Sequence, residues 1–87
     1  MLLKYDQTAD ALHIRFSVAP VDRSEQLEPG TLVDIDWIGR LVGIELIRPA
    51  RAWPLEDVVE RFALADEDVV MLRSLWPSNG VYPFVVR

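Results

Sequence analysis

The feature that most constrains the fold is an alternation of apolar and polar residues through the first half of the chain. In one stretch, Leu12, Ile14 and Phe16 alternate with His13, Arg15 and Ser17, and the same period of two recurs further along the chain. Because successive side chains of a β-strand point to opposite faces of a sheet, this period predicts strands that bury one face and expose the other.

The apolar members of these alternations are predicted to form the buried face of one sheet. They are Leu3, Tyr5, Leu12, Ile14, Phe16, Val33, Ile35, Trp37, Val42, Ile44 and Leu46. The opposite, polar face is predicted to carry Lys4, Asp6, His13, Arg15, Asp34, Asp36 and Glu45. Opposite charges on neighbouring strands contribute ~0.2 to 1 kcal/mol per pair, so we expect Arg15 to pair with Asp34 or Glu45 and help fix the register.

Turn-forming residues separate these strands. A polar turn joins the first two, where Asp6 and Asp10 can hydrogen-bond nearby backbone groups. Residues 22–28 form a polar connection that has room for a short edge strand. Gly30 and Gly39 suit turn positions with positive φ. The first half therefore predicts an antiparallel β-meander of about four strands.

The apolar period lengthens after Pro49. The apolar positions that follow are Leu55, Val58, Val59 and Phe62. This spacing is that of an amphipathic helix, and Pro54 suits its first turn. A sheet with one apolar face must be covered, so we expect a helix over residues 54–64 to cover it.

A second, shorter helix is predicted from Asp66, as its N-cap, to Trp76, because Pro77 stops it. Residues 81–87 are predicted to form a terminal strand, which Pro83 confines to a sheet edge. The fold class predicted is α+β, in a single domain over residues 1–87. It divides into a meander core at 1–49 and a helical C-terminal extension at 50–87.

Composition excludes several classes of function. A chain of 87 residues supports one core, with a stability near the low end of the ~5 to 15 kcal/mol range. With no cysteine there is no disulfide, thiolate metal site or cysteine nucleophile. The net charge of −5 disfavours direct binding to nucleic acid or anionic membrane. No apolar run has the length of a membrane span or a signal peptide, so we expect a cytoplasmic location.

Six short runs of the first half form a recognisable combination. They are Tyr5-Asp6, Ala9-Asp10-Ala11-Leu12, Ser24-Glu25, Glu28-Pro29-Gly30, Val33-Asp34 and Gly39-Arg40-Leu41-Val42-Gly43-Ile44-Glu45-Leu46. Together they resemble the domain of unknown function 2283 family of small prokaryotic proteins. The resemblance implies an antiparallel sheet with an accompanying helix and no established activity. Some relatives look like the antitoxin half of toxin and antitoxin pairs, which implies an inhibitory role with a small toxin as the partner.

Catalytic constellations are missing from the sequence. His13 is the only histidine and lacks the context of a serine triad, so an ordinary surface histidine is favoured. No phosphate-binding loop or zinc-protease motif is present, and no cofactor is expected. The alternative is a metal-binding protein or metal-dependent hydrolase that uses Asp34, Asp36 and Glu45, although Arg15 would compete for their oxygens.

The C-terminal extension carries more apolar residues than one sheet needs. The predicted partner-binding residues are Val69, Leu72, Trp76, Tyr82, Phe84 and Val86. They either meet another chain or fold back onto their own sheet, and the sequence leaves both open. The function predicted is that of a non-catalytic module that forms a homo-oligomer, as a dimer, or binds another protein in the manner of an antitoxin.

Overall fold

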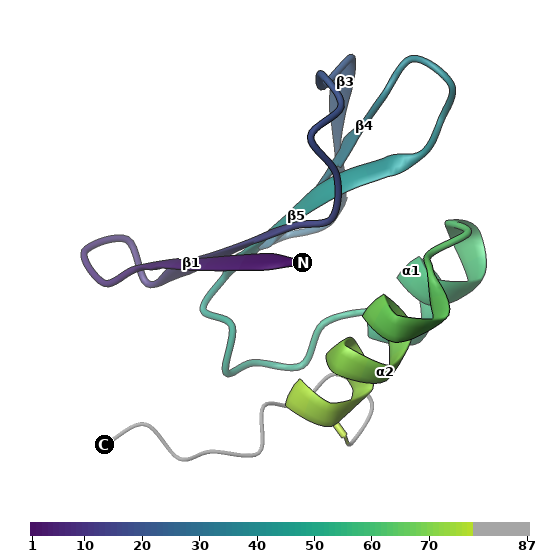
Figure 1. Cartoon of the computed structure of the whole chain (residues 1–87). Coiled ribbons are helices and arrows are strands. Elements are labelled where there is room, and N and C mark those ends of the chain that lie inside the picture. The colour runs from purple at the N-terminus through teal and green to yellow at the C-terminus, as the bar shows by residue number, and fades with distance from the viewer. Residues whose placement is uncertain (78–87) are drawn as a thin grey trace. The chain divides into compact units, whose positions relative to one another are not determined.

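The computed structural model describes residues 1–77 (Figure 1). The chain divides into two compact units, Met1–Arg48, which holds a sheet, and Pro49–Arg87, which holds two helices. The predicted terminal strand at residues 81–87 lies outside the described residues, as do Tyr82, Phe84 and Val86. The α+β class, with an antiparallel sheet followed by helices, is confirmed.

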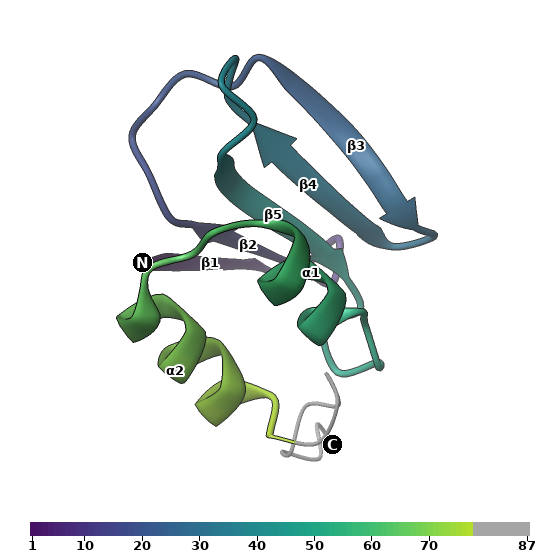
Figure 2. The ribbon, with the colours of Figure 1, turned by 90° about the vertical axis from the view of Figure 1, so that its right-hand side faces the viewer.

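The first unit is one five-stranded antiparallel sheet. Its strands are β1 (Leu2–Asp6), β2 (Ala11–Arg15), β3 (Arg23–Glu28), β4 (Thr31–Ile35) and β5 (Leu41–Ile47). Their order across the sheet is β1-β2-β5-β4-β3, which Figure 2 shows edge to edge. The polar connection at residues 22–28 therefore does contain a strand, β3, which forms one edge of the sheet.

The strand order corrects the expectation of a simple meander. β2 does not pair with β3, the next strand in the chain, but with β5, and β4 pairs with β5 on its other side. β5 is the most continuously buried strand of the sheet. A strand with apolar side chains on both faces is most stable where neighbours cover both of its edges, so β5 takes the centre.

The apolar core of this unit follows the predicted alternation. Ile14, Val33 and Ile44 are fully buried, and the register places them side by side on β2, β4 and β5. Ile35 and Leu46 are buried with them. Complete burial of a side chain of this size contributes about 1.5 to 3 kcal/mol, so these five residues dominate the stability of the sheet.

Three residues predicted to be buried are exposed. Leu3 and Tyr5 lie opposite Ile14 and Leu12 as expected, but β1 is an edge strand and leaves them open. Trp37 is 80% exposed, because β4 ends at Ile35 after a register shift and Trp37 falls in the following turn. The prediction failed here because alternation alone cannot tell where a strand stops.

Asp36, predicted on the polar face, is instead a buried turn residue that is 7% exposed. Its Oδ1 accepts hydrogen bonds from the backbone N–H of Ile38 at 3.0 Å and of Arg40 at 2.8 Å. Gly39 supplies the positive φ of 98° that this turn requires. Asp36 therefore fixes the β4–β5 turn from its inside.

Asp6 fixes the β1–β2 turn as the sequence predicted. The Oδ1 of Asp6 accepts the backbone N–H of Thr8 at 3.0 Å and of Ala9 at 3.3 Å. Asp10 follows in the left-handed region at φ 47°, a conformation that aspartate tolerates better than most residues. The backbone hydrogen bonds expected of Asp6 are confirmed, whereas the carboxylate of Asp10 accepts the hydroxyl of Tyr5 instead.

The second unit contains α1 (Leu55–Arg61) and α2 (Asp66–Leu75). Ala65 occupies the N-cap of α2 and makes no side-chain cap bond, so the prediction that Asp66 caps this helix is wrong. Asp66 lies in the first turn, where its negative charge favours the positive end of the helix dipole. Among residues 1–77, no helix is long and apolar enough to cross a membrane.

Three contacts link separate segments of the second unit. The indole rings of Trp53 and Trp76 meet edge to face, with centroids 5.3 Å apart, and Trp76 Nε1 donates to the carbonyl oxygen of Pro49 at 3.1 Å. On the surface, Arg73 donates to both carboxylate oxygens of Glu56, at 2.6 and 3.2 Å. These hydrogen bonds lower the pKa of the Glu56 carboxyl and raise that of Arg73.

Candidate functional site

The polar face of the sheet is arranged in cross-strand rows. One row, from β1 to β3, contains Lys4, His13, Glu45, Leu32 and Gln26. The next row contains Leu2, Arg15, Gly43, Asp34 and Ser24. The second row has a gap at Gly43, the one position in these rows that carries no side chain.

Three polar side chains meet across that gap. His13 Nε2 lies 3.4 Å from Asp34 Oδ2, and Ser24 Oγ donates to Asp34 Oδ1 at 2.6 Å. Because β5 runs between β2 and β4, the contact between His13 and Asp34 passes over the central strand. A Cβ on Gly43 would lie 3.4 Å from His13 Nε2 and 3.6 Å from Asp34 Oδ2. The absent side chain therefore leaves room for this His13–Asp34–Ser24 cluster.

The geometry of the cluster does not activate a nucleophile. A catalytic serine donates its proton to a neighbouring base, usually an imidazole. Here the Ser24 hydroxyl is bonded to Asp34, and the imidazole lies on the other oxygen of that carboxylate. The cluster links β3, β4 and β2 through polar side-chain contacts. Half of the His13 side chain is exposed.

Arg15 was predicted to pair with Asp34 or Glu45, but His13 is the residue that contacts Asp34. Arg15 instead donates from Nε to the carbonyl oxygen of Ser17 at 2.8 Å. The signal that sequence reasoning missed was Gly43, which interrupts an otherwise bulky strand. Glycine inside a strand often marks a place where other groups approach closely.

The three predicted metal ligands are not brought together. Asp34 belongs to the cluster, Asp36 is directed into its own turn, and Glu45 lies in the row of His13. Within residues 1–77, no group of three or more histidine, aspartate or glutamate side chains is placed to hold a metal ion.

A hollow of about 230 Å³ lies on the polar face next to the β1–β2 turn. Its lining residues are Lys4, Asp6, Ala9, Ala11, His13 and Glu45. Cationic and anionic side chains share this lining, so no single-sign field develops to attract a charged ligand.

β1 is an edge strand with large apolar side chains exposed. Leu2 is 70% exposed, Leu3 47% and Tyr5 51%. All five residues of β1 pair in regular register with β2, without a bulge. An edge strand with regular register and exposed apolar side chains can pair with another strand.

The opposite edge, β3, is protected by contrast. It carries the charges of Arg23, Glu25 and Glu28, and a register shift interrupts its pairing between Gln26 and Glu28. Charged side chains and bulges are the devices that keep sheet edges from pairing with other chains. β1 also carries two charges, Lys4 and Asp6, but it has no bulge and it exposes large apolar side chains.

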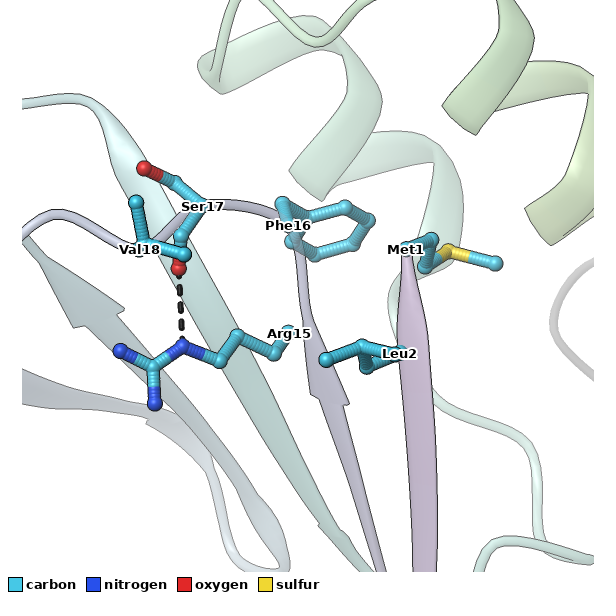
Figure 3. Close-up of a pocket in the computed structure, with 6 residues that line it drawn as sticks. All are labelled: Met1, Leu2, Arg15, Phe16, Ser17 and Val18. Atoms are coloured by element: carbon cyan, nitrogen blue, oxygen red, sulfur yellow. Dashed lines mark hydrogen bonds between the residues drawn. The ribbon is translucent and has the colours of Figure 1, made fainter.

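A second hollow, of about 440 Å³, lies at the start of β1 (Figure 3). Its lining residues are Met1, Leu2, Arg15, Phe16, Ser17 and Val18. Most of this lining is apolar, and Val18 is almost fully exposed at its rim. The hollow extends the apolar surface of β1 beyond the strand itself.

Tyr5 also carries the clearest electrostatic perturbation on β1. Its hydroxyl donates to Asp10 Oδ1 at 2.6 Å across the β1–β2 turn. This hydrogen bond to a carboxylate favours the protonated phenol, and the pKa of Tyr5 is raised above its ordinary value of 10.0. The contact therefore stabilises the hairpin below about pH 10 and is lost as the pH rises through the folded-state pKa.

Replacing Asp10 by asparagine should move the pKa of Tyr5 back toward its ordinary value, because the amide lacks the charge and is a weaker acceptor. Asparagine tolerates the positive φ at this position, so the turn is expected to keep its shape. The pKa can be followed by tyrosinate absorbance in a Tyr82→Phe background, which leaves Tyr5 as the only tyrosine. An unchanged titration in Asp10→Asn would show that the hydrogen bond does not form in solution.

The predicted partner-binding residues of the C-terminal unit are placed differently. Leu72 is fully buried and Trp76 is 1% exposed, so neither lies on the surface, and Val69 is half-buried. The exposed apolar residues of α2 are Val70 and Met71. Helical periodicity identified the apolar side of α2 correctly, but that side faces inward.

Comparison with known proteins gives one match. A model of the family described as "Protein of unknown function (DUF2283)" matches residues 3–48, which is more than half of the chain and includes all five strands except the first residue of β1. No curated protein and no solved structure matches significantly. The matched segment coincides with the sheet unit and its polar cluster. The chain therefore belongs to the DUF2283 family of proteins of unknown function.

Proposed function

We propose that this chain is a non-catalytic protein-binding module whose edge strand β1 joins the sheet of another protein chain. The observation that carries the proposal is the difference between the two edges of the sheet. β1 exposes Leu2, Leu3 and Tyr5 on a strand without a bulge, whereas β3 is bulged and exposes no large apolar side chain. A regular edge strand with exposed apolar side chains is a place where another strand can add.

Energetics support the same role. A small domain buries a low fraction of its surface, so its own stability is modest. Covering Leu2, Leu3 and Tyr5 would remove exposed apolar surface at about 25 cal/mol per Å². Backbone hydrogen bonds to a partner strand would add to this gain. Binding through β1 therefore stabilises both the complex and the fold.

A non-enzymatic role is supported by the chemistry of the polar face. Its only histidine contacts a carboxylate that already accepts the Ser24 hydroxyl, so the cluster offers no activated nucleophile among the described residues. An antitoxin-like role belongs to this proposal as one form of it, in which the strand that adds to β1 belongs to a small toxin.

The test compares matched substitutions on the two edges. Leu3→Lys places a charge on the outer edge of β1 and is expected to weaken association about tenfold or more, because charged edge residues oppose strand addition. Gln26→Lys also introduces a lysine, but on β3 at the opposite edge, and it is expected to leave association unchanged. Light scattering on size-exclusion chromatography measures self-association, and affinity purification from the native host with both variants measures other partners.

Circular dichroism of both variants confirms that the sheet is intact before association is compared. The proposal predicts that wild type and Gln26→Lys form the same complex and that Leu3→Lys loses it. A wild-type chain that stays monomeric and captures no partner in a β1-dependent way would contradict the proposal.

A further inference from the structure

We infer that the chain that β1 binds is a second copy of this one, paired antiparallel, β1 to β1, about a two-fold axis at Tyr5. This inference rests on the proposed function and names its partner and register. It follows from the symmetry of strand pairing, from the order of charges along β1 and from the apolar side chains that share a face with Tyr5.

Symmetry restricts the registers that two copies can adopt. A two-fold axis that relates neighbouring antiparallel strands stands perpendicular to the sheet, so the polar faces of both copies lie on the same side. One residue then lies opposite the same residue of the second copy, and the residues before it pair with those at the same separation after it. The central residues of β1 offer three such axes, at Leu3, Lys4 or Tyr5.

Charge selects among these axes. With the axis at Lys4, that lysine faces the partner's Lys4, and like charges directly opposite each other are destabilising. With the axis at Leu3, Lys4 faces the partner's Leu2 and gains no charged partner. With the axis at Tyr5, Lys4 faces the partner's Asp6 and the same pair forms a second time by symmetry. Each pair contributes ~0.2 to 1 kcal/mol, so only the Tyr5 axis makes β1 complementary to itself in charge.

The apolar face supports the same axis. Tyr5 faces the partner's Tyr5, and aromatic pairs of this kind favour cross-strand contact. Leu3 shares the face of Tyr5 on β1 and lies diagonal to the partner's Tyr5, a separation that an aromatic ring can span. Four exposed apolar side chains, two from each copy, would thereby cover one another.

Backbone groups are available for this pairing. Within residues 1–77, β1 pairs with β2 alone, so its outer edge has no strand beside it. Addition of the second copy would join the two five-stranded sheets into one continuous sheet. In this register, residues 4–6 of the two strands lie opposite one another, and Leu2 and Leu3 lie opposite the β1–β2 turn of the second copy.

A single-cysteine scan reads the register directly, because the chain has no cysteine of its own. In the Tyr5→Cys variant, the two thiols lie on directly opposite residues, whose Cα atoms are about 4.5 to 5.5 Å apart and within disulfide range. In Leu3→Cys and Lys4→Cys, the paired positions lie four and two residues apart along the strands, beyond the ~7 Å limit. Gln26→Cys on β3 is the control for random encounters.

Under mild oxidation of dilute protein, Tyr5→Cys is expected to form a disulfide-linked dimer at least about tenfold faster than the other three variants, because only its thiols are held within reach. Non-reducing electrophoresis measures this dimer. Faster disulfide formation in Leu3→Cys or Lys4→Cys would overturn the register about Tyr5. Equal rates for all four variants would overturn the pairing of two copies along β1.

Charge reversal supplies a second measurement that does not alter Tyr5. Lys4→Glu places glutamate opposite the partner's Asp6 twice, so dimerisation should weaken about tenfold. Arg23→Glu reverses one charge on β3 and is expected to leave the dimer unchanged. If the axis lay at Lys4 instead, Lys4→Glu would only exchange one like-charge pair for another, and unchanged dimerisation would overturn the Tyr5 axis.

The outcomes separate this inference from the proposed function. One outcome is that the wild type is monomeric, Tyr5→Cys forms no dimer, and a complex with a different protein depends on Leu3. This outcome overturns the inference that the partner is a second copy and leaves the binding role of β1 in place. Absence of any association that depends on β1 overturns both. A Tyr5→Cys dimer that forms fastest, together with weakening by Lys4→Glu, supports the inference.

Discussion

Replacing Gly43 by valine is expected to lower the free energy of unfolding by about 3 kcal/mol, at the upper end of the usual effect of overpacking. Gly43 lies on the central strand β5, and a Cβ at this position would come within 2.9 Å of the carbonyl oxygen of Ile14. That oxygen belongs to the backbone of the neighbouring strand, so it cannot rotate away as a side chain would. The two methyl groups of valine would also crowd His13 and Asp34.

The expected loss is large relative to the stability of a chain this short, which lies near the low end of the ~5 to 15 kcal/mol range. The matched control is Glu45→Val, which introduces the same side chain at an exposed position on the same strand. Its effect should stay within about 0.5 kcal/mol. Urea unfolding followed by circular dichroism measures both variants, and equal stabilities would contradict the close approach over Gly43.

Replacing Trp76 by alanine is expected to lower the free energy of unfolding by about 3 to 5 kcal/mol. Trp76 is 1% exposed, meets Trp53 edge to face and donates to the carbonyl oxygen of Pro49. Alanine would leave a cavity and remove both contacts at once. The aromatic pair alone is worth ~0.5 to 1.5 kcal/mol beyond the area it buries.

Met71→Ala is the control for Trp76→Ala, because Met71 lies on the same helix α2 and is about half exposed. Its truncation should change the free energy of unfolding by about 0.5 kcal/mol or less. The measurement is again urea unfolding by circular dichroism. If Trp76→Ala were as mild as the control, Trp76 would not be a core residue, and its assignment to a partner-binding surface would return.

Local patterns along the chain predicted the elements well but not their arrangement. The alternation through Ile14, Val33 and Ile44 predicted three buried strand positions, and the glycines at the two tight turns have the positive φ expected of them. Which strands pair is decided by contacts between residues far apart in sequence. The placement of β5 between β2 and β4 therefore had no local signal beyond the apolar character of that strand.

The errors have separate physical causes. Trp37 was assigned to the core because the alternation continues past the register shift that ends the pairing of β4. Leu3 and Tyr5 follow the correct face, but their burial depends on the position of β1 at an edge, which alternation does not encode. Asp36 had the same sequence signature as Asp34, and only the turn geometry separates a buried carboxylate from one on the sheet face.

The candidate binding edge was missed for the same reason. Sequence reasoning placed the surplus of apolar residues in the C-terminal extension, where Leu72 and Trp76 are now explained as core. On the strands of the sheet unit, the large apolar residues that stay exposed are those of β1, while Val18, Val21, Trp37 and Ile38 are exposed in its connections. Only the strand order shows that Leu2, Leu3 and Tyr5 belong to an edge with no neighbouring strand in the described part of the chain.

Amide hydrogen exchange over a series of protein concentrations tests most directly whether β1 is the edge that binds another chain. If two copies pair along β1 about Tyr5, the outward-facing amides within residues 4–6 gain protection as the concentration rises, while the amides of Arg23–Glu28 on the other edge exchange at a constant rate. Leu3→Lys should remove that concentration dependence. Exchange in β1 that is the same at the lowest and highest concentrations, or protection that grows in β3 instead, would contradict the assignment of β1 as the binding edge.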